Sequence, residues 1–135
     1  LWTERDTYHP IYEFGIVDND GNGYTFAYRN YYVDIRLFRY DAYDITFLNE
    51  TDLLSRPDSE TWFYTQFIYD NGVLIGRVYD YTGKLYDEVR FNDTTYTYFT
   101  RICITGTGTK QLIDSLKIYR YIEPEPIAQI RYLGK

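Results

Sequence analysis

The chain of 135 residues contains no methionine, one cysteine (Cys103) and one histidine (His9). A single cysteine cannot close an internal disulfide, and Cys103, between two isoleucines, is interpreted as a small buried apolar side chain rather than a reactive thiol. The lone His9 argues against multi-histidine metal sites and histidine-based catalytic triads. Because methionine is absent and Leu1 stands first, we expect a segment cut from a longer translation product.

Basic residues and long apolar runs are also scarce. Acidic side chains outnumber basic ones by 20 to 14, which gives a net charge of -6 and a pI near 4.7. This balance disfavours nucleic acid as a partner, because phosphate binding needs clustered Lys and Arg. No apolar run approaches the roughly 18 residues of a membrane-spanning helix. The acidity suits an extracellular surface, or carboxylates that bind calcium.

Tyrosine, by contrast, fills 18 positions, mostly in short alternating segments separated by Gly and Asn turns. Aromatic and β-branched residues in period two predict strands, and no segment predicts more than one helical turn, at 51–56. We therefore predict an all-β fold: an antiparallel β-sandwich of the jelly-roll type with about nine strands. The domain is expected to span 1–122, with a proline-rich break at 123–126 and a tail or added strand at 127–135. The predicted strands are 11–17, 24–28, 31–39, 43–48, 62–69, 73–81, 84–91, 96–105 and 112–122.

From Trp62 onward, several sequence signals follow one another in order. An Asn71-Gly72 turn precedes Val78-Tyr79-Asp80-Tyr81-Thr82-Gly83, and Tyr98-Phe99-Thr100-Arg101-Ile102 comes before the closing run at 113–121. This series resembles the concanavalin A-like, laminin-G-type jelly rolls of archaeal and bacterial surface or virion proteins. The resemblance implies a jelly-roll fold in an extracellular setting. The opening strands of such domains have no counterpart in this chain.

Two places could hold a structural calcium ion. Asp18-x-Asp20-x-Asn22-Gly23 has the alternating oxygen ligands and glycine of a calcium loop, but Arg29 stands where the bidentate Glu would be. The alternative is a plain polar hairpin turn. The resemblance also implies a calcium role for Asp114, since related sugar-binding jelly rolls often place an Asp there. The alternative for Asp114 is a carboxylate that accepts hydrogen bonds from the backbone.

No catalytic residues are predicted. Glycosidases of this fold use Glu-x-Asp-x-Glu, which projects two carboxylates from one strand into a cleft, and the chain has no such segment. Asp87 and Glu88 are adjacent, so they should point to opposite faces of a strand. We therefore predict that the protein is not an enzyme.

Aromatic residues and glycosylation motifs suggest contacts at the surface. Tyr and Trp can stack on sugar rings, pair across strands or anchor a protein interface. Two Asn-x-Thr motifs, at Asn49 and Asn92, are expected in loops and predict an exported glycoprotein. The candidate ligand-binding residues are Trp62, Tyr64, Tyr119 and Tyr121.

These observations together predict a non-catalytic extracellular module of a surface, filament or virion protein, acting in assembly or adhesion. The alternative is a carbohydrate-binding, lectin-like domain. Expected partners are other copies or domains of the same assembly, and glycans in the second case. The β-forming residues at 127–133 lead us to hypothesise that the tail completes a sheet, either in its own chain or in a neighbour.

Overall fold

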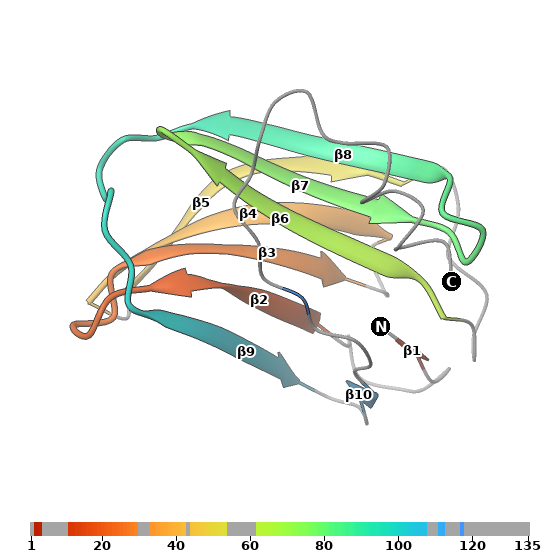
Figure 1. Ribbon diagram of the computed structural model, residues 1–135, viewed down its shortest axis with the longest axis horizontal. Helices are drawn as coiled ribbons and strands as arrows, with labels where there is room; N and C mark the ends of the chain where they lie inside the picture. The colour runs from red at the N-terminus through yellow and green to blue at the C-terminus, as the bar shows by residue number, and fades with distance from the viewer. Residues whose placement is uncertain are drawn as a thin grey trace.

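The computed structural model of the chain describes residues 2–3, 11–29, 33–42, 44–53, 62–107, 111–112 and 117. These residues contain ten strands and no helix, so the prediction of an all-β protein is confirmed (Figure 1). No helix in the described part could cross a membrane. The strands are β1 (Trp2–Thr3), β2 (Ile11–Val17), β3 (Gly23–Arg29), β4 (Asp34–Asp41), β5 (Asp44–Asp52), β6 (Tyr64–Asp70), β7 (Val73–Tyr79), β8 (Leu85–Asn92), β9 (Arg101–Thr107) and β10 (Gln111–Leu112).

Eight of these strands form two antiparallel sheets, as in a β-sandwich. The five-stranded sheet has the order β5-β4-β3-β2-β9, and the three-stranded sheet has the order β6-β7-β8. The short strands β1 and β10 pair separately. From β2 to β5, and again from β6 to β8, each strand pairs with the next strand in the sequence. Residues 93–100 then return the chain to the five-stranded sheet, where β9 pairs with β2. Jelly-roll connectivity and the concanavalin A-like family stay predictions.

The hairpin turns follow from residues that tolerate positive φ. Asn71 and Gly72 join β6 to β7 with φ of 47° and 87°, the pattern of a type I′ turn. Gly83 has φ of 86° in the turn between β7 and β8, where the Gly83 amide donates to the Asp80 carbonyl over 2.9 Å. Both turns were predicted from the sequence at these positions.

The core lies between the sheets and is built largely from tyrosine and phenylalanine of β3. Tyr24, Phe26 and Tyr28 alternate along this central strand and are fully buried. The Phe26 ring meets Phe14 edge-on at 5.8 Å between centroids, and Tyr28 stacks on Tyr12 at 5.9 Å. Aromatic pairs of this kind add to the stabilisation from burial alone.

One side of the sandwich is closed by side chains. Asn49 Nδ2 donates to the Arg90 carbonyl over 2.7 Å, and Thr51 Oγ1 donates to the Glu88 carbonyl over 3.0 Å. These bonds join β5 to β8, the adjacent edges of the two sheets. On the opposite side, β9 is the last strand of the five-stranded sheet and lies at the bottom of the view in Figure 1.

The structure corrects two local predictions. Neither Asn-x-Thr asparagine lies in a loop: Asn49 lies within β5, because the edge strand extends to Asp52, and Asn92 is the last residue of β8. The strand expected from Tyr96 begins only at Arg101, because residues 93–100 cross between the sheets. The predicted strand 112–122, apart from Leu112 and Lys117, lies outside the described residues, as do the break at 123–126 and the tail at 127–135.

Candidate functional site

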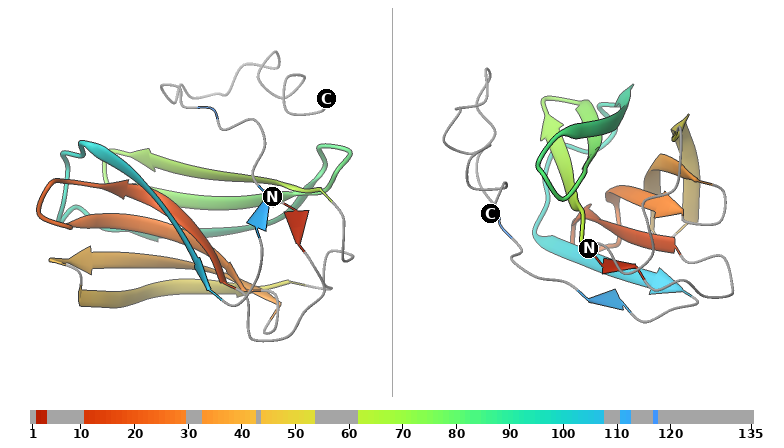
Figure 2. Two further views of the ribbon diagram at one scale, coloured as in Figure 1. Left: turned by 90° about the horizontal axis from the view of Figure 1, so that it is seen from below. Right: turned by 90° about the vertical axis from the view of Figure 1, so that its right-hand side faces the viewer.

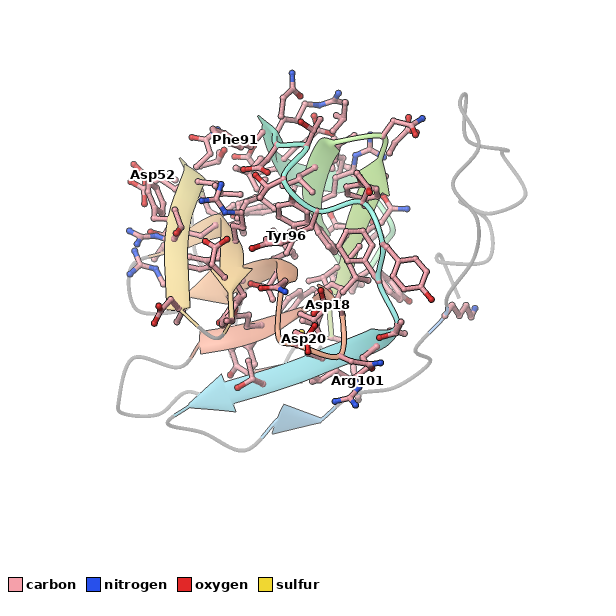
Figure 3. All side chains as sticks on the ribbon, turned by 90° about the vertical axis from the view of Figure 1, so that its left-hand side faces the viewer. Asp18, Asp20, Asp52, Phe91, Tyr96 and Arg101 are labelled. Carbon is pink, nitrogen blue, oxygen red and sulfur yellow. The ribbon has the colours of Figure 1, made fainter. Side chains whose placement is uncertain are left out.

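The predicted calcium loop forms a tight turn between β2 and β3, at the end of the sandwich seen in Figure 3. Asp18 Oδ1 accepts hydrogen bonds from the amides of Asp20 (2.8 Å) and Asn22 (2.9 Å), and Asp18 Oδ2 accepts one from Asn22 Nδ2 (3.0 Å). The Asn22 side-chain oxygen accepts a bond from the Ala42 amide over 2.8 Å. The bond from the Asn22 amide is the largest cause that lowers the pKa of Asp18. The side-chain oxygens of Asp18 and Asn22 thus accept hydrogen bonds from N–H groups, and these bonds stabilise the turn.

Calcium binding stays a prediction on this geometry. A cation at the loop would have to replace the hydrogen bonds that Asp18 accepts, and the Asp20 side chain is exposed. Within the described ranges, no three His, Cys, Asp or Glu side chains gather as a metal site. Asp114 lies outside these ranges.

A larger polar cluster, missed by sequence reasoning, lies between the sheets at the same end; we call it the Asp93 network (Tyr24, Arg39, Asp41, Asp93 and Tyr96). Asp93 Oδ1 accepts from the Tyr24 hydroxyl at 2.6 Å, and Asp93 Oδ2 accepts from Arg39 Nη1 at 2.8 Å. Arg39 Nε also donates to Asp41, and the Tyr96 hydroxyl donates to Asp41 Oδ1 at 2.6 Å. Tyr96 projects into this space from the crossing segment (Figure 3). The network therefore ties residues 93–100 to β3 and β4.

The pKa shifts within the network indicate that its hydrogen bonds have a structural role. Burial alone would raise the pKa of Asp93, but hydrogen bonds from Tyr24, Thr95 and Arg39 outweigh it and lower the pKa to about 2. Burial, followed by the bond to Asp93, raises the pKa of Tyr24. Bonds to Asp41 and Asp93 raise the pKa of Arg39. One cation between two carboxylates gives the network a net charge of -1, and the arginine is held by both acids.

The predicted aromatic platform is only partly described. Trp62 is 42% exposed and Tyr64 is half-buried, while Phe63 between them is buried against Tyr28, at 5.3 Å between ring centroids. The alternation places Trp62 and Tyr64 on the same face, away from the core. Tyr119 and Tyr121 lie outside the described residues.

Two apolar patches mark the two edges of the five-stranded sheet. The β9 patch consists of Ile102 (42% exposed) and Ile104 (47% exposed), and the β5 patch consists of Ile45 (61% exposed) and Phe47 (49% exposed). The register places the β9 patch on the core-facing side, in rows with Ile16 and Phe14 of β2. Sequence reasoning missed these patches because an exposed edge strand and an internal strand have the same alternation.

Cys103 lies between the two residues of the β9 patch and points to the other face. The sequence predicted a buried side chain, but Cys103 is half-buried because β9 is an edge strand. Burial, and then the nearby Glu13 carboxylate, raises the pKa of Cys103. Glu13 accepts bonds from Tyr40 (2.7 Å) and Thr25 on this outer face. Both effects favour the protonated thiol, and its low reactivity stays a prediction.

The two Asn-x-Thr motifs have different surroundings. Asn92 is exposed at the last position of β8, whereas the Asn49 amide nitrogen, the atom that a glycan would modify, donates to β8. A glycan at Asn49 would replace one of the two hydrogens on this nitrogen and place a sugar where β5 meets β8. Glycosylation stays a prediction, and the geometry favours Asn92.

Replacing Asn49 by alanine should lower the free energy of unfolding by about 1 kcal/mol, because the Arg90 carbonyl loses its donor. Urea denaturation measures this difference. The matched control, Asn92→Ala, should stay within about 0.5 kcal/mol of wild type. Equal effects of the two substitutions would contradict the role of Asn49 in joining the sheets.

No protein-family model matches the chain, and no solved structure matches it. The chain is similar to a Methanocaldococcus jannaschii protein described as uncharacterized protein MJ1394, at 29% identity over 109 residues. The matched region covers 81% of this chain and 11% of the relative. The chain thus spans a small fraction of the length of the curated relative that it matches.

Proposed function

We propose that this chain is a non-catalytic, extracellular β-sandwich module of a surface, filament or virion protein, and that it acts in assembly or adhesion. The observation that carries the proposal is the pair of apolar patches at opposite edges of one sheet, on β5 and β9. Contiguous exposed apolar side chains mark surfaces that contact other molecules. The match to a small part of a much longer relative also supports a modular role.

The way in which β9 is held suits a contact surface. The Thr100 amide donates to the Val17 carbonyl over 3.0 Å, and Thr100 Oγ1 donates to Asn19 Oδ1 over 3.0 Å. These bonds fix the start of β9 against β2, just after the segment that the Asp93 network anchors. A surface that is ordered before contact loses less conformational entropy on binding.

Antibodies against the chain should label the envelope or external structures of the source cells, or the surface of virions, in immunogold electron microscopy. The physical reason is that assembly of a surface layer requires these patches to meet neighbours outside the cell. Pre-adsorption of the antibody with purified chain is the control. Label confined to the cytoplasm would overturn the proposal.

The second candidate is a carbohydrate-binding domain, favoured by the exposed Trp62 with Tyr64 on the same face. Indole and phenol rings there could stack on a sugar. A glycan array distinguishes the two functions: binding that Trp62→Ala abolishes, and that the matched Tyr98→Ala at another exposed aromatic retains, would favour the lectin.

A further inference from the structure

The outer edge of β9 is a template for another strand. Among the described residues, β9 pairs with β2 alone, and its far edge has no described neighbour. Seen from below in Figure 2, β9 crosses in front of the other strands of its sheet. The strand has seven residues, no proline and a single charge, Arg101. An edge of this length without a bulge or internal charge invites strand pairing.

The other edge of the same sheet is protected. β5 carries acidic residues at Asp44, Glu50 and Asp52, and its register with β4 shifts between Leu37 and Phe38. Its side chains are also bonded to β8. Charges and bulges of this kind discourage strand addition, so among the described strands of this sheet β9 offers the less protected edge.

We propose that β9 pairs antiparallel with β9 of a second copy of this chain, about a two-fold axis at Cys103. Five strands from each copy would then form one continuous ten-stranded sheet. The inference deepens the proposed function, on which it rests, by naming the partner and the surface. In this register Ile102 faces Ile104 of the second copy, so a two-fold contact covers both β9 patches.

Charge complementarity supports a second copy as the occupant. In this register Arg101 faces Thr105 of the second copy, and Thr105 lies beside Glu13 in its own sheet. Arg101, Thr105 and Glu13 share the outer face, and two strand spacings separate Arg101 from the other Glu13 by about 10 Å between backbones. Glu13 Oε1 accepts hydrogen bonds from Thr25 and Tyr40 in its own sheet, so Arg101 and Glu13 attract each other across the contact without forming a direct ion pair. The symmetry supplies two such attractions, one on each side of the axis.

Sedimentation of the whole chain should give a dimer of twice 16.3 kDa. Ile104→Lys should weaken dimerisation about a hundredfold or more, because it places a cation opposite Ile102 of the second copy. Leu85→Lys is the matched control, since it adds the same charge at an exposed apolar side chain outside both patches and should leave the dimer intact. A monomer at all accessible concentrations, or a dimer lost only in Leu85→Lys, would overturn the pairing.

Cysteine cross-linking tests the register itself. Cα atoms directly opposite in an antiparallel pair lie about 4.5–5.5 Å apart, within disulfide range. Because the pKa of the Cys103 thiol is raised, oxidation at alkaline pH, where the thiolate forms, should give a reducible, covalently linked dimer that Cys103→Ser abolishes. A dimer without this cross-link would place the contact elsewhere and reject the proposed register. A monomeric chain on the cell surface would reject the pairing alone, whereas a cytoplasmic location would reject the proposed function.

Discussion

Replacing Gly76 by alanine should lower the free energy of unfolding by about 2 kcal/mol, within the usual range for an overpacked core. A Cβ atom at Gly76 would lie 2.1 Å from Cδ2 and 2.4 Å from Cε2 of Phe26. The Phe26 ring is fully buried at the centre of β3 and already meets Phe14 edge-on, so it has little room to move. Glycine in the middle of β7 is therefore required by the close approach of the two sheets. Urea denaturation of the two proteins measures the loss.

A double substitution tests whether the Phe26 ring is the cause. Phe26→Leu alone should cost about 1–2 kcal/mol through lost burial. Because the smaller side chain makes room for the new methyl group, the double variant should be more stable than the two single losses predict, by about 1 kcal/mol. Strict additivity, or a neutral Gly76→Ala, would show that the sheets do not meet at this point.

The contact between Gly76 and Phe26 could not be predicted from the sequence. Alternation predicted the strand around Gly76 and the turns on either side of it, because these signals are local. It could not predict which sheet would face the glycine. On β3, alternation predicts one buried face, yet Thr25 and Ala27 are as buried as Tyr24 and Phe26. This two-sided burial depends on strands that are distant in the sequence.

In the candidate site too, the sequence predicts local features but not contacts between distant residues. The Asp18–Asn22 turn was predicted as a calcium loop or a polar turn, because its ligand pattern is contiguous in the sequence. In the sequence, Asp93 is only the middle residue of an Asn-x-Thr motif. Its partners Arg39 and Tyr24 lie 54 and 69 residues away, so no local pattern could identify it as the centre of a network. The position of β9 at the edge of the described sheet likewise depends on its pairing with the distant β2.

Replacing Asp93 by asparagine should lower the free energy of unfolding at pH 7 by about 2 kcal/mol, since it removes charge-assisted hydrogen bonds in a buried setting. The Asp93 side chain is 7% exposed, and its two oxygens serve Tyr24 and Arg39. An amide can accept only on its one oxygen, and its NH₂ group would face the guanidinium. The exposed Asp20→Asn is the matched control and should stay within about 0.5 kcal/mol of wild type.

The dependence of this effect on pH identifies the charge as its source. The pKa of Asp93 is about 2 in the folded protein, below the 3.8 of a free side chain. A lowered pKa means that the stabilisation is fully present above about pH 4 and is lost as the pH falls through 2. At about 1.4 kcal/mol per pKa unit, the shift from 3.8 to about 2 corresponds to a loss of about 2.5 kcal/mol. The stability of wild type and Asp93→Asn should therefore converge as the solution is acidified.

Urea denaturation from pH 7 to pH 2 tests this convergence, and the difference between the two proteins cancels the acids that they share. Tyr24→Phe provides a second arm, because loss of the hydroxyl donor should raise the pKa of Asp93 and move the acid-dependent loss to higher pH. Because the network anchors residues 93–100, Asp93→Asn should also speed hydrogen exchange at the start of β9 more than in β7. A gap between wild type and Asp93→Asn that stays constant down to pH 2 would mean that the Asp93 carboxylate stabilises through packing rather than charge.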